Sequence, residues 1–422
     1  MAAPSSVSTP ATGAVPAPSG GRFAAFGALR HRNFRYFWFG QLSAVSAQTM
    51  EFVAVAWLVL DLTGSPALLG LTSLAQAAPT LVFFLFAGAA ADRTDRRRLL
   101  TTIFAIAATI YFVIGALVVS HQVQVWQVVL AALLLGCLRV MDQPARHGMI
   151  PNTVPRESLS SAIAMASLAF QVPRPVAPAV AGVLIAIVGI GPTYFFIGGC
   201  AILAMTMYGL LRVDGKPQGG GGHGWRQDVL DGLRFVRSDQ VIYGLIGMSF
   251  VNSLFGMSYV VLLPVLARQN LHVGSEAYGL MQTATGVGGL VGTVLAAQLA
   301  RSGHRGVQAI AGAVLFGVSL IGLSLSPWYL LAVVVLFLVG AVNQLYMTTT
   351  TMTLQLSIPN ELRGRVMSIW GITFSMIPLG GALSGLVAEH FGAPFAMALG
   401  GVMVIATTLV VAALLPRIRH LG

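Results

Sequence analysis

The stretch FAGAAADRTDRRRLL, residues 86–100, places a dense group of charges between two long apolar runs. Residues 62–91 contain no Asp, Glu, Lys or Arg, six charged residues then fall within seven positions, and residues 99–138 again contain none. A helix needs roughly 20 mainly apolar residues to cross the hydrocarbon core of a bilayer. Its backbone groups are then hydrogen-bonded within the segment, as the absence of water in the core requires. The stretch therefore predicts a short charged loop between two membrane-spanning helices.

The composition of the whole chain also indicates a membrane protein. Hydrophobic residues make up 56% of the 422 residues and charged residues only 9%, whereas soluble domains carry about 25% charged residues. Cys137 and Cys200 both fall inside apolar runs, which argues against a disulfide framework or a cysteine metal site. The predicted fold class is an all-α integral membrane protein.

Apolar runs separated by turn signals and charges predict twelve transmembrane helices. The predicted spans are 36–60, 66–91, 99–120, 125–146, 160–188, 193–211, 240–265, 275–300, 306–325, 328–350, 365–389 and 393–415.

Basic residues gather on one side of this predicted topology. With the N-terminus inside, all but three of the 24 Lys and Arg residues fall in inner segments; the exceptions are Arg139 and Arg174 within spans and Arg268 outside. Short cytoplasmic loops retain Lys and Arg, so we expect both termini in the cytoplasm and the protein in a bacterial plasma (inner) membrane. The net charge of +11 then reflects topology and attraction to anionic lipid rather than nucleic-acid binding.

A polar stretch in mid-chain separates six predicted spans from six. It contains GGGG at 219–222, then Trp225, Val229, Leu233 and Val236 at helical spacing. This pattern predicts a flexible linker followed by an amphipathic helix on the inner membrane face. The predicted parts of the chain are a disordered cytoplasmic N-terminal tail (1–30), an N-terminal six-helix half (31–211), the cytoplasmic linker (212–239), a C-terminal six-helix half (240–416) and a cytoplasmic C-terminal tail (417–422).

The two halves repeat a pattern. VPRESL (154–159) precedes the fifth span and IPNEL (358–362) precedes the eleventh. Pro175 and Gly182 then lie seven residues apart in the fifth span, as do Pro378 and Gly385 in the eleventh. Paired repeats around a central site are how many transporters are built, so we expect pseudo-symmetric halves around a cavity. Chance recurrence of proline and glycine in apolar runs is the alternative.

The charged loop resembles the signature of the major facilitator superfamily, Gly-x-x-x-Asp-Arg-x-Gly-Arg-Arg. The matching residues are Gly88, Asp92, Arg93, Arg96 and Arg97, and Asp95 stands where the signature has glycine. Four further stretches resemble the macrolide-efflux and enterobactin-exporter-like branch: RNFRYFWFGQL (32–42), LTGSPALLG (62–70), DQPARHGMIPNTVPRESL (142–159) and ELRGRVMSIW (361–370).

The resemblance implies a role for this loop in gating. In the family the loop latches the two halves, so Asp92 is expected to meet the start of the eleventh helix near Gly364 and Arg365. Breaking the latch would let the protein change from outward-facing to inward-facing. Retention of arginines on the inner side explains the basic residues of the loop without such a latch, but not its aspartates.

Glu51 lies well inside the first predicted span, where an ionisable group costs roughly 2.5–3.5 kcal/mol on insertion scales. Gln48 and Gln41 precede it by three and ten residues, so the three side chains can share one helix face. The resembling branch often has an acid at the position of Gln48. A carboxyl group in apolar surroundings can exchange protons near neutral pH, so Glu51 is a candidate coupling group or counter-charge for a cationic substrate. A hydrogen-bonded structural Glu is the alternative.

Three more charges fall within predicted spans. Arg139 and Asp142 lie three residues apart in the fourth span, which favours a local ion pair over a role in transport. Arg174 lies between Pro173 and Pro175 in the fifth span. It has three possible partners: backbone carbonyls freed by the prolines, Glu51, or an anionic substrate.

The resemblance also suggests residues of the cavity wall, since helices one, four, seven and ten line the cavity in the family. Asn252, Tyr259, Asn343 and Gln344 are polar groups in the seventh and tenth spans, and are therefore candidate substrate contacts, with interhelical hydrogen bonds as the alternative. The stretch APAVAG (177–182) resembles the Gly-Pro-x-x-x-Gly antiporter motif through Pro178 and Gly182, with Ala177 in place of the first glycine.

The predicted function is proton-coupled efflux of amphiphilic small molecules, such as drugs, by alternating access. A dedicated exporter of one metabolite, such as a siderophore, is the alternative. An integral-membrane enzyme is disfavoured because the eight histidines are scattered without metal-ligand spacing. No Walker motif is present, so no nucleotide or other cofactor is expected, and the expected partners are a small-molecule substrate, a coupling proton and membrane lipids, with the protein acting as a monomer.

Overall fold

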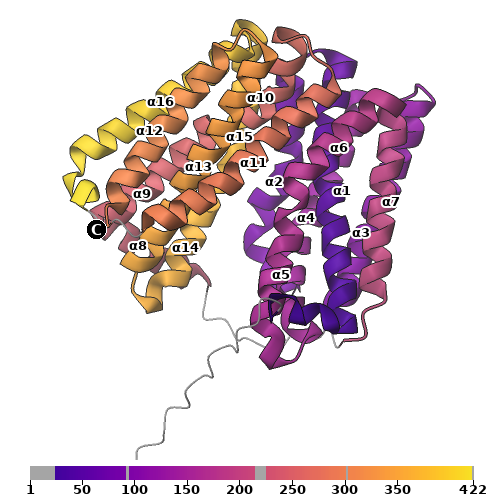
Figure 1. Ribbon diagram of the computed structural model, residues 1–422, viewed down its shortest axis with the longest axis horizontal. Coiled ribbons are helices and arrows are strands. Elements are labelled where there is room, and N and C mark those ends of the chain that lie inside the picture. The colour runs from indigo at the N-terminus through magenta and orange to yellow at the C-terminus, as the bar shows by residue number, and fades with distance from the viewer. Residues whose placement is uncertain (1–23, 92–94, 214–224, 301–302, 421–422) are drawn as a thin grey trace, which may run out of the picture.

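The computed structural model describes residues 24–91, 95–213, 225–300 and 303–420. They form two helical bundles joined by a linker helix (Figure 1). The N-terminal half contains η1 (Ala24–Arg30), α1 (Arg32–Thr63), α2 (Pro66–Ala91), α3 (Arg96–Val119), α4 (Val125–Thr153), η2 (Arg156–Ser158), α5 (Leu159–Gln171), α6 (Pro173–Val188) and α7 (Ile190–Gly209).

The C-terminal half follows the linker helix α8 (Trp225–Ser238). It contains α9 (Gln240–Val251), η3 (Asn252–Gly256), α10 (Tyr259–Val265), η4 (Leu266–Asn270), α11 (Ser275–Leu299), α12 (Arg305–Ser324), α13 (Tyr329–Ser357), α14 (Asn360–Phe374), α15 (Met376–Phe391), α16 (Ala393–Leu414) and η6 (Pro416–His420).

The helices confirm an all-α membrane protein. Within the described residues, eleven helical segments are long and apolar enough to cross a bilayer. The bundle also includes α2, whose 26 residues carry no charged side chain. Three of the spans are composite: α5 continues into α6, α9 into α10 and α14 into α15.

The breaks in the composite spans lie within the predicted spans 160–188, 240–265 and 365–389. Pro173 and Pro175 have no backbone N–H, so the fifth span bends between Gln171 and Pro173. The eleventh span is interrupted at Ser375, three residues before Pro378. The seventh span contains two π-helical turns, η3 and η4, a feature common near functional sites.

Both chain ends contain ordered helical turns, and the N-terminal one falls within the tail predicted as disordered (1–30). Ala24–Arg30 forms η1, and its buried Ala28 donates its backbone N–H to Ser161 Oγ at 3.2 Å. At the other end Ile418 of η6 is buried in a cluster with Val236 of α8 and Ile242 of α9. Residues 1–23 and the glycine run at 219–222 lie outside the described residues.

The repeated proline–glycine pattern corresponds to two matching contacts between the halves. On one side α6 packs on α11: a Cβ on Gly182 would lie 2.3 Å from the Ser275 carbonyl oxygen. On the other side α15 packs on α2: a Cβ on Gly385 would lie 2.6 Å from the Pro66 carbonyl oxygen. Both distances are too short for any side chain, so glycine lets each pair of helices pack closely.

The halves meet at the end of the molecule opposite α8 and diverge toward α8 (Figure 1). We call the end that carries α8 the linker end. Polar contacts that we call the inter-half clamp join the halves at the opposite end. Arg268 forms an ion pair with Asp61 at 2.8 Å, and Gln269 donates to the Gly64 carbonyl at 2.7 Å.

Glu389 of α15 completes the inter-half clamp. Its Oε2 accepts hydrogen bonds from Ser65 Oγ at 2.8 Å and from the Ala67 backbone N–H at 3.1 Å. A carboxylate of the C-terminal half therefore caps the first turn of α2, a helix of the N-terminal half, where a negative charge is favourable.

Candidate functional site

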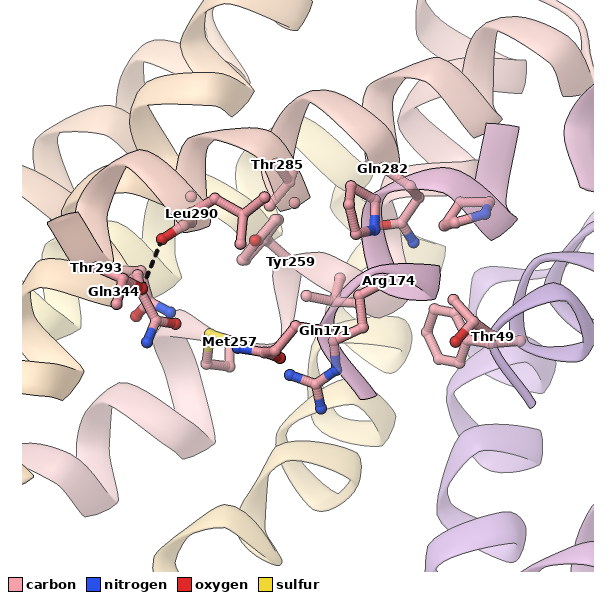
Figure 2. Close-up of a pocket in the computed structure, with 18 residues that line it drawn as sticks. Thr49, Gln171, Arg174, Met257, Tyr259, Gln282, Thr285, Leu290, Thr293 and Gln344 are labelled. Atoms are coloured by element: carbon pink, nitrogen blue, oxygen red, sulfur yellow. Dashed lines mark hydrogen bonds between the residues drawn. The ribbon is translucent and has the colours of Figure 1, made fainter. Parts of the chain in front are cut away.

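A cavity of about 430 Å³ lies between the two halves. Thr49 and Phe52 of α1, Gln171 of α5 and Arg174 of α6 line it from the N-terminal half. From the C-terminal half the polar lining residues are Tyr259, Gln282, Thr285, Thr293, Asn343 and Gln344. Figure 2 shows these side chains facing the same space from the two bundles. The site is thus apolar and amide-rich with one charged side chain among its described lining residues, Arg174.

Arg174 reaches the cavity because the helix is broken beside it. The break after Gln171 ends α5, and Arg174 is the second residue of α6. Its guanidinium carbon lies 4.4 Å from the centre of the Phe170 ring, a cation–π contact. No described carboxylate pairs with Arg174, so neither Glu51 nor another described acid is its partner. The Pro175 carbonyl accepts a hydrogen bond from Thr283 Oγ1 of α11, at 2.6 Å.

A second cavity, of about 380 Å³, adjoins the first on the N-terminal half. Gln171 and Arg174 line both cavities. The other polar lining residues of the second cavity are Gln41, Gln143, Arg146, His147 and Ser167. Gln41 also donates to the Ala166 carbonyl at 2.9 Å, which joins α1 to α5. Two arginines, Arg146 and Arg174, therefore line this pair of neighbouring cavities.

Glu51 lies inside the N-terminal half and does not line either cavity. Its side chain is 1% exposed and forms an ion pair with Arg139 of α4. Gln76 of α2 donates to Glu51 Oε1 at 3.0 Å, and the buried Tyr111 of α3 lies beside the pair. Four helices thus surround this carboxylate.

The predicted local pair of Arg139 with Asp142 is wrong. Arg139 turns to Glu51, and Asp142 pairs with Arg146, four residues later on the same helix. Asp142 Oδ2 also accepts from Gln48 Nε2 at 2.8 Å. The spacing of three in α4 directs the two side chains to different parts of α1, so two polar bridges join α1 to α4.

The polar residues predicted in the seventh and tenth spans divide between the cavity and its surroundings. Tyr259, Asn343 and Gln344 line the cavity. Asn252 lies behind the wall, 1% exposed, and its Nδ2 donates to Asn343 Oδ1 at 3.4 Å. Asn252 is thus better described as support for Asn343 than as a direct contact for a substrate.

The loop signature is only partly within the described residues. Asp92 and Arg93 lie outside them, so the latch to Gly364 and Arg365 stays a prediction. Gly88 is in the last turn of α2. Arg97 donates to the Gly209 carbonyl of α7, and Arg96 donates to the Gly148 carbonyl of α4. These arginines therefore hold the linker end of the N-terminal half together.

Arg365 and Gly364 lie on α14 in the C-terminal half. Arg365 packs against α8, where a Cβ on Gly232 would lie 3.3 Å from the Cβ of Arg365. Among the described residues outside the adjacent turns of α14, no atom lies within 4 Å of the position of a Cβ on Gly364.

Two functional features escaped sequence reasoning. Asp95 caps α3 by accepting hydrogen bonds from the backbone N–H groups of Arg97 and Arg98, at 2.9 and 3.2 Å. An aspartate directly before the first helical residue is a recognisable capping signal. The polar residues of α11 on the cavity wall, Gln282, Thr285 and Thr293, were the other omission. Their separations of three and eight residues place them on one helix face.

The prolines and glycines of the repeated pattern and of the antiporter-like motif, which we expected to bend the helices, have defined positions. Pro175 and Pro178 line the cavity on α6, and Gly182 and Gly385 form the close contacts between halves. Pro378 is in the first turn of α15. Within the described residues, no group of three or more His, Cys, Asp or Glu side chains is arranged to hold a metal ion.

Comparison with known proteins gives consistent relatives over nearly the whole chain. A family model described as a transmembrane secretion effector matches residues 23–420. The staphyloferrin A transporter of Staphylococcus aureus is 25% identical over 85% of this chain and 90% of its own length. The multidrug efflux pump Tap of Mycolicibacterium fortuitum is 28% identical over 91% of this chain and 95% of its own length. Macrolide efflux protein A of Streptococcus pyogenes is 23% identical over 89% of this chain and 94% of its own length.

Solved structures share the architecture. A bacterial homologue of the human lysosomal transporter Spinster superposes with a TM-score of 0.73 at 13% identity, over 95% of this chain and 99% of the other. The nucleoside transporter NupG superposes with a TM-score of 0.72 at 11% identity, over 90% of this chain and 98% of the other. At identities this low, the superposition shows a shared fold and nothing more.

Proposed function

This chain belongs to the transmembrane secretion effector family of the major facilitator superfamily, and from that membership we propose that it is a secondary exporter of amphiphilic small molecules. It is a multi-pass integral membrane transporter and not an enzyme. The drug efflux pumps among its relatives support export as the direction of transport. A dedicated exporter of one metabolite, such as a siderophore, is the second candidate, and the staphyloferrin A transporter among the relatives favours it.

The observation that carries the proposal is the position of the cavity of about 430 Å³ between the two halves. Both halves line it, and contacts between the halves close the end opposite α8. A movement of one half against the other would therefore break the inter-half clamp and expose the same residues to the opposite side. This is how alternating access works around a fixed site.

We place the linker end in the cytoplasm, because most of the basic residues are near it and short cytoplasmic loops retain Lys and Arg. The structure is then inward-facing. Labelling of Arg237→Cys on α8 by a membrane-impermeant maleimide in intact cells would contradict this orientation, since that position should be reachable only from inside.

Glu51 is our candidate for the proton-coupling group. A proton on its carboxylate would cancel the attraction to Arg139 of α4 and release that side chain. Gln76 of α2, Tyr111 of α3 and Tyr194 of α7 also lie near the carboxylate. Thr49 and Phe52 flank Glu51 on α1 and line the cavity. A shift of α1 on protonation of Glu51 would therefore also move the cavity wall.

Efflux measured in reconstituted vesicles tests the proposal. Vesicles that contain the full chain are loaded with a lipophilic cation, a macrolide or a catecholate siderophore, and a pH gradient is imposed across their membrane. We expect the gradient to drive at least one compound, and Glu51→Gln to lose this driven movement while it retains exchange of that compound without a gradient.

The matched control is Glu276→Gln, which removes an exposed carboxylate outside both cavities. It should leave driven transport unchanged. Driven transport that survives in Glu51→Gln would contradict coupling at that residue, and the absence of movement for every compound would contradict drug or siderophore export.

A further inference from the structure

Basic side chains line the two adjoining cavities, and no described carboxylate does. Arg174 lines both, and Arg146 and His147 line the second. No carboxylate of the described residues lines either cavity. An amphiphilic compound in this space would therefore meet aromatic and amide groups together with one exposed arginine.

The acids of the N-terminal half are neutralised away from the cavities. Glu51 pairs with Arg139, and Asp142 pairs with Arg146 and accepts from Gln48. The side chains of both acids are almost fully buried, 1% and 2% exposed. Neither is available to hold a cationic substrate while these pairs are intact.

The arginines keep hydrogen-bonding capacity that the described chain does not use. Arg174 pairs with no described carboxylate and rests on the Phe170 ring. Arg146, which is 6% exposed, uses Nη2 for Asp142, while its Nη1 has no hydrogen-bond partner within the described residues. A guanidinium group presents five donors in a planar fork that matches a carboxylate.

We propose that the substrate of this exporter is an anionic amphiphile whose carboxylate binds Arg174 at the junction of the two cavities, with its apolar part against Phe52 and Met257. The partly desolvated guanidinium attracts a carboxylate more strongly there than in water and repels a cation. Gln171 beside Arg174 adds a neutral amide that can donate to the same carboxylate. The inference rests on the proposed function, because it takes this cavity as the transport site.

Binding of three naphthyl probes that differ in their polar end group (anionic, neutral or cationic) tests the inference. The probes are 1-naphthylacetate, 1-naphthylacetamide and 2-(1-naphthyl)ethylammonium, titrated calorimetrically into the full chain in lipid nanodiscs. The neutral amide partitions into lipid more than the acid does, so lipid binding works against the expected order. We expect the acid to bind tenfold to about a hundredfold more tightly than the amide, as for other charge-assisted hydrogen bonds, and the ammonium to bind most weakly.

Variants separate a charge effect from damage to the fold. Arg174→Gln should reduce the affinity for the acid to that for the amide while the affinity for the amide stays within about twofold. Arg174→Lys should keep part of the preference, because it retains the charge without the planar fork. Arg156→Gln removes an exposed arginine outside both cavities and should leave the affinities for all three probes unchanged.

Three results would overturn the inference: equal binding of acid and amide, a preference for the acid that persists in Arg174→Gln, or no binding of the acid in the millimolar range. Transport is measured separately in vesicles. Selective binding of the acid by a chain that moves none of the tested compounds would support the anion site and contradict the export proposal.

Discussion

At the scale of single residues, the most consequential feature is the way α1 and α4 share their charges. Glu51 and Gln48 lie one turn apart on α1, and each meets a different charged residue of α4, Arg139 or Asp142. Breaking a buried ion pair by removing one partner leaves an unpaired charge in a medium of low dielectric, which costs more than the pair contributes when intact.

We therefore predict that Arg139→Gln destabilises the N-terminal half. The unpaired Glu51 carboxylate should cost about 3–5 kcal/mol, seen as a lower midpoint of thermal unfolding followed by tryptophan fluorescence in detergent. The double variant Glu51→Gln with Arg139→Gln should regain most of the loss, because it leaves no buried charge. If the single and double variants unfolded at the same temperature, the pair would not be the buried contact described above.

At the scale of helices, close packing at glycine decides how the halves meet. The α6–α11 contact at Gly182 and the α15–α2 contact at Gly385 leave no room for a side chain. Gly199 of α7 offers the same helical environment with open space, since no atom of the other described elements lies within 4 Å of a Cβ there.

We predict opposite effects for the same substitution at two sites. Gly199→Ala should be neutral or stabilise the protein by up to about 1 kcal/mol, because alanine favours the helix. Gly182→Ala should lower the unfolding midpoint and slow transport, since its methyl group would lie 2.3 Å from the Ser275 carbonyl. Equal midpoints for the two variants would show that α6 and α11 do not pack as closely as described.

The helices themselves were predictable from the sequence, and most of the site was not. The charge-free run ending at Ala91 is a local signal, so the predicted span 66–91 coincides with α2 (Pro66–Ala91). The Glu51–Arg139 pair joins residues far apart in the chain, and its existence depends on how α1 crosses α4. Spacing along α4 instead suggested Asp142 as the partner, because sequence distance is a poor guide to contact between helices.

At the scale of the whole molecule, the two halves form a closed end and an end that opens toward α8. The inter-half clamp uses exposed groups, with Arg268 and Asp61 side chains 37% and 49% exposed. Exposed ion pairs contribute roughly 0–1 kcal/mol. The clamp can therefore break without a large energetic cost, as a gate that opens in every transport cycle requires.

Alternating access around the cavity is the central claim, and crosslinking of the clamp tests it most directly. Asp61→Cys and Arg268→Cys are introduced together with Asn343→Cys on the cavity wall, after Cys137 and Cys200 are replaced by serine. A membrane-impermeant thiol reagent is then applied to vesicles from each side, before and after oxidation of the clamp cysteines. We predict labelling of position 343 from both sides while the clamp is reduced, and from the linker end alone once it is oxidised. Labelling from the clamp side after oxidation, or from one side only in the reduced protein, would contradict the account.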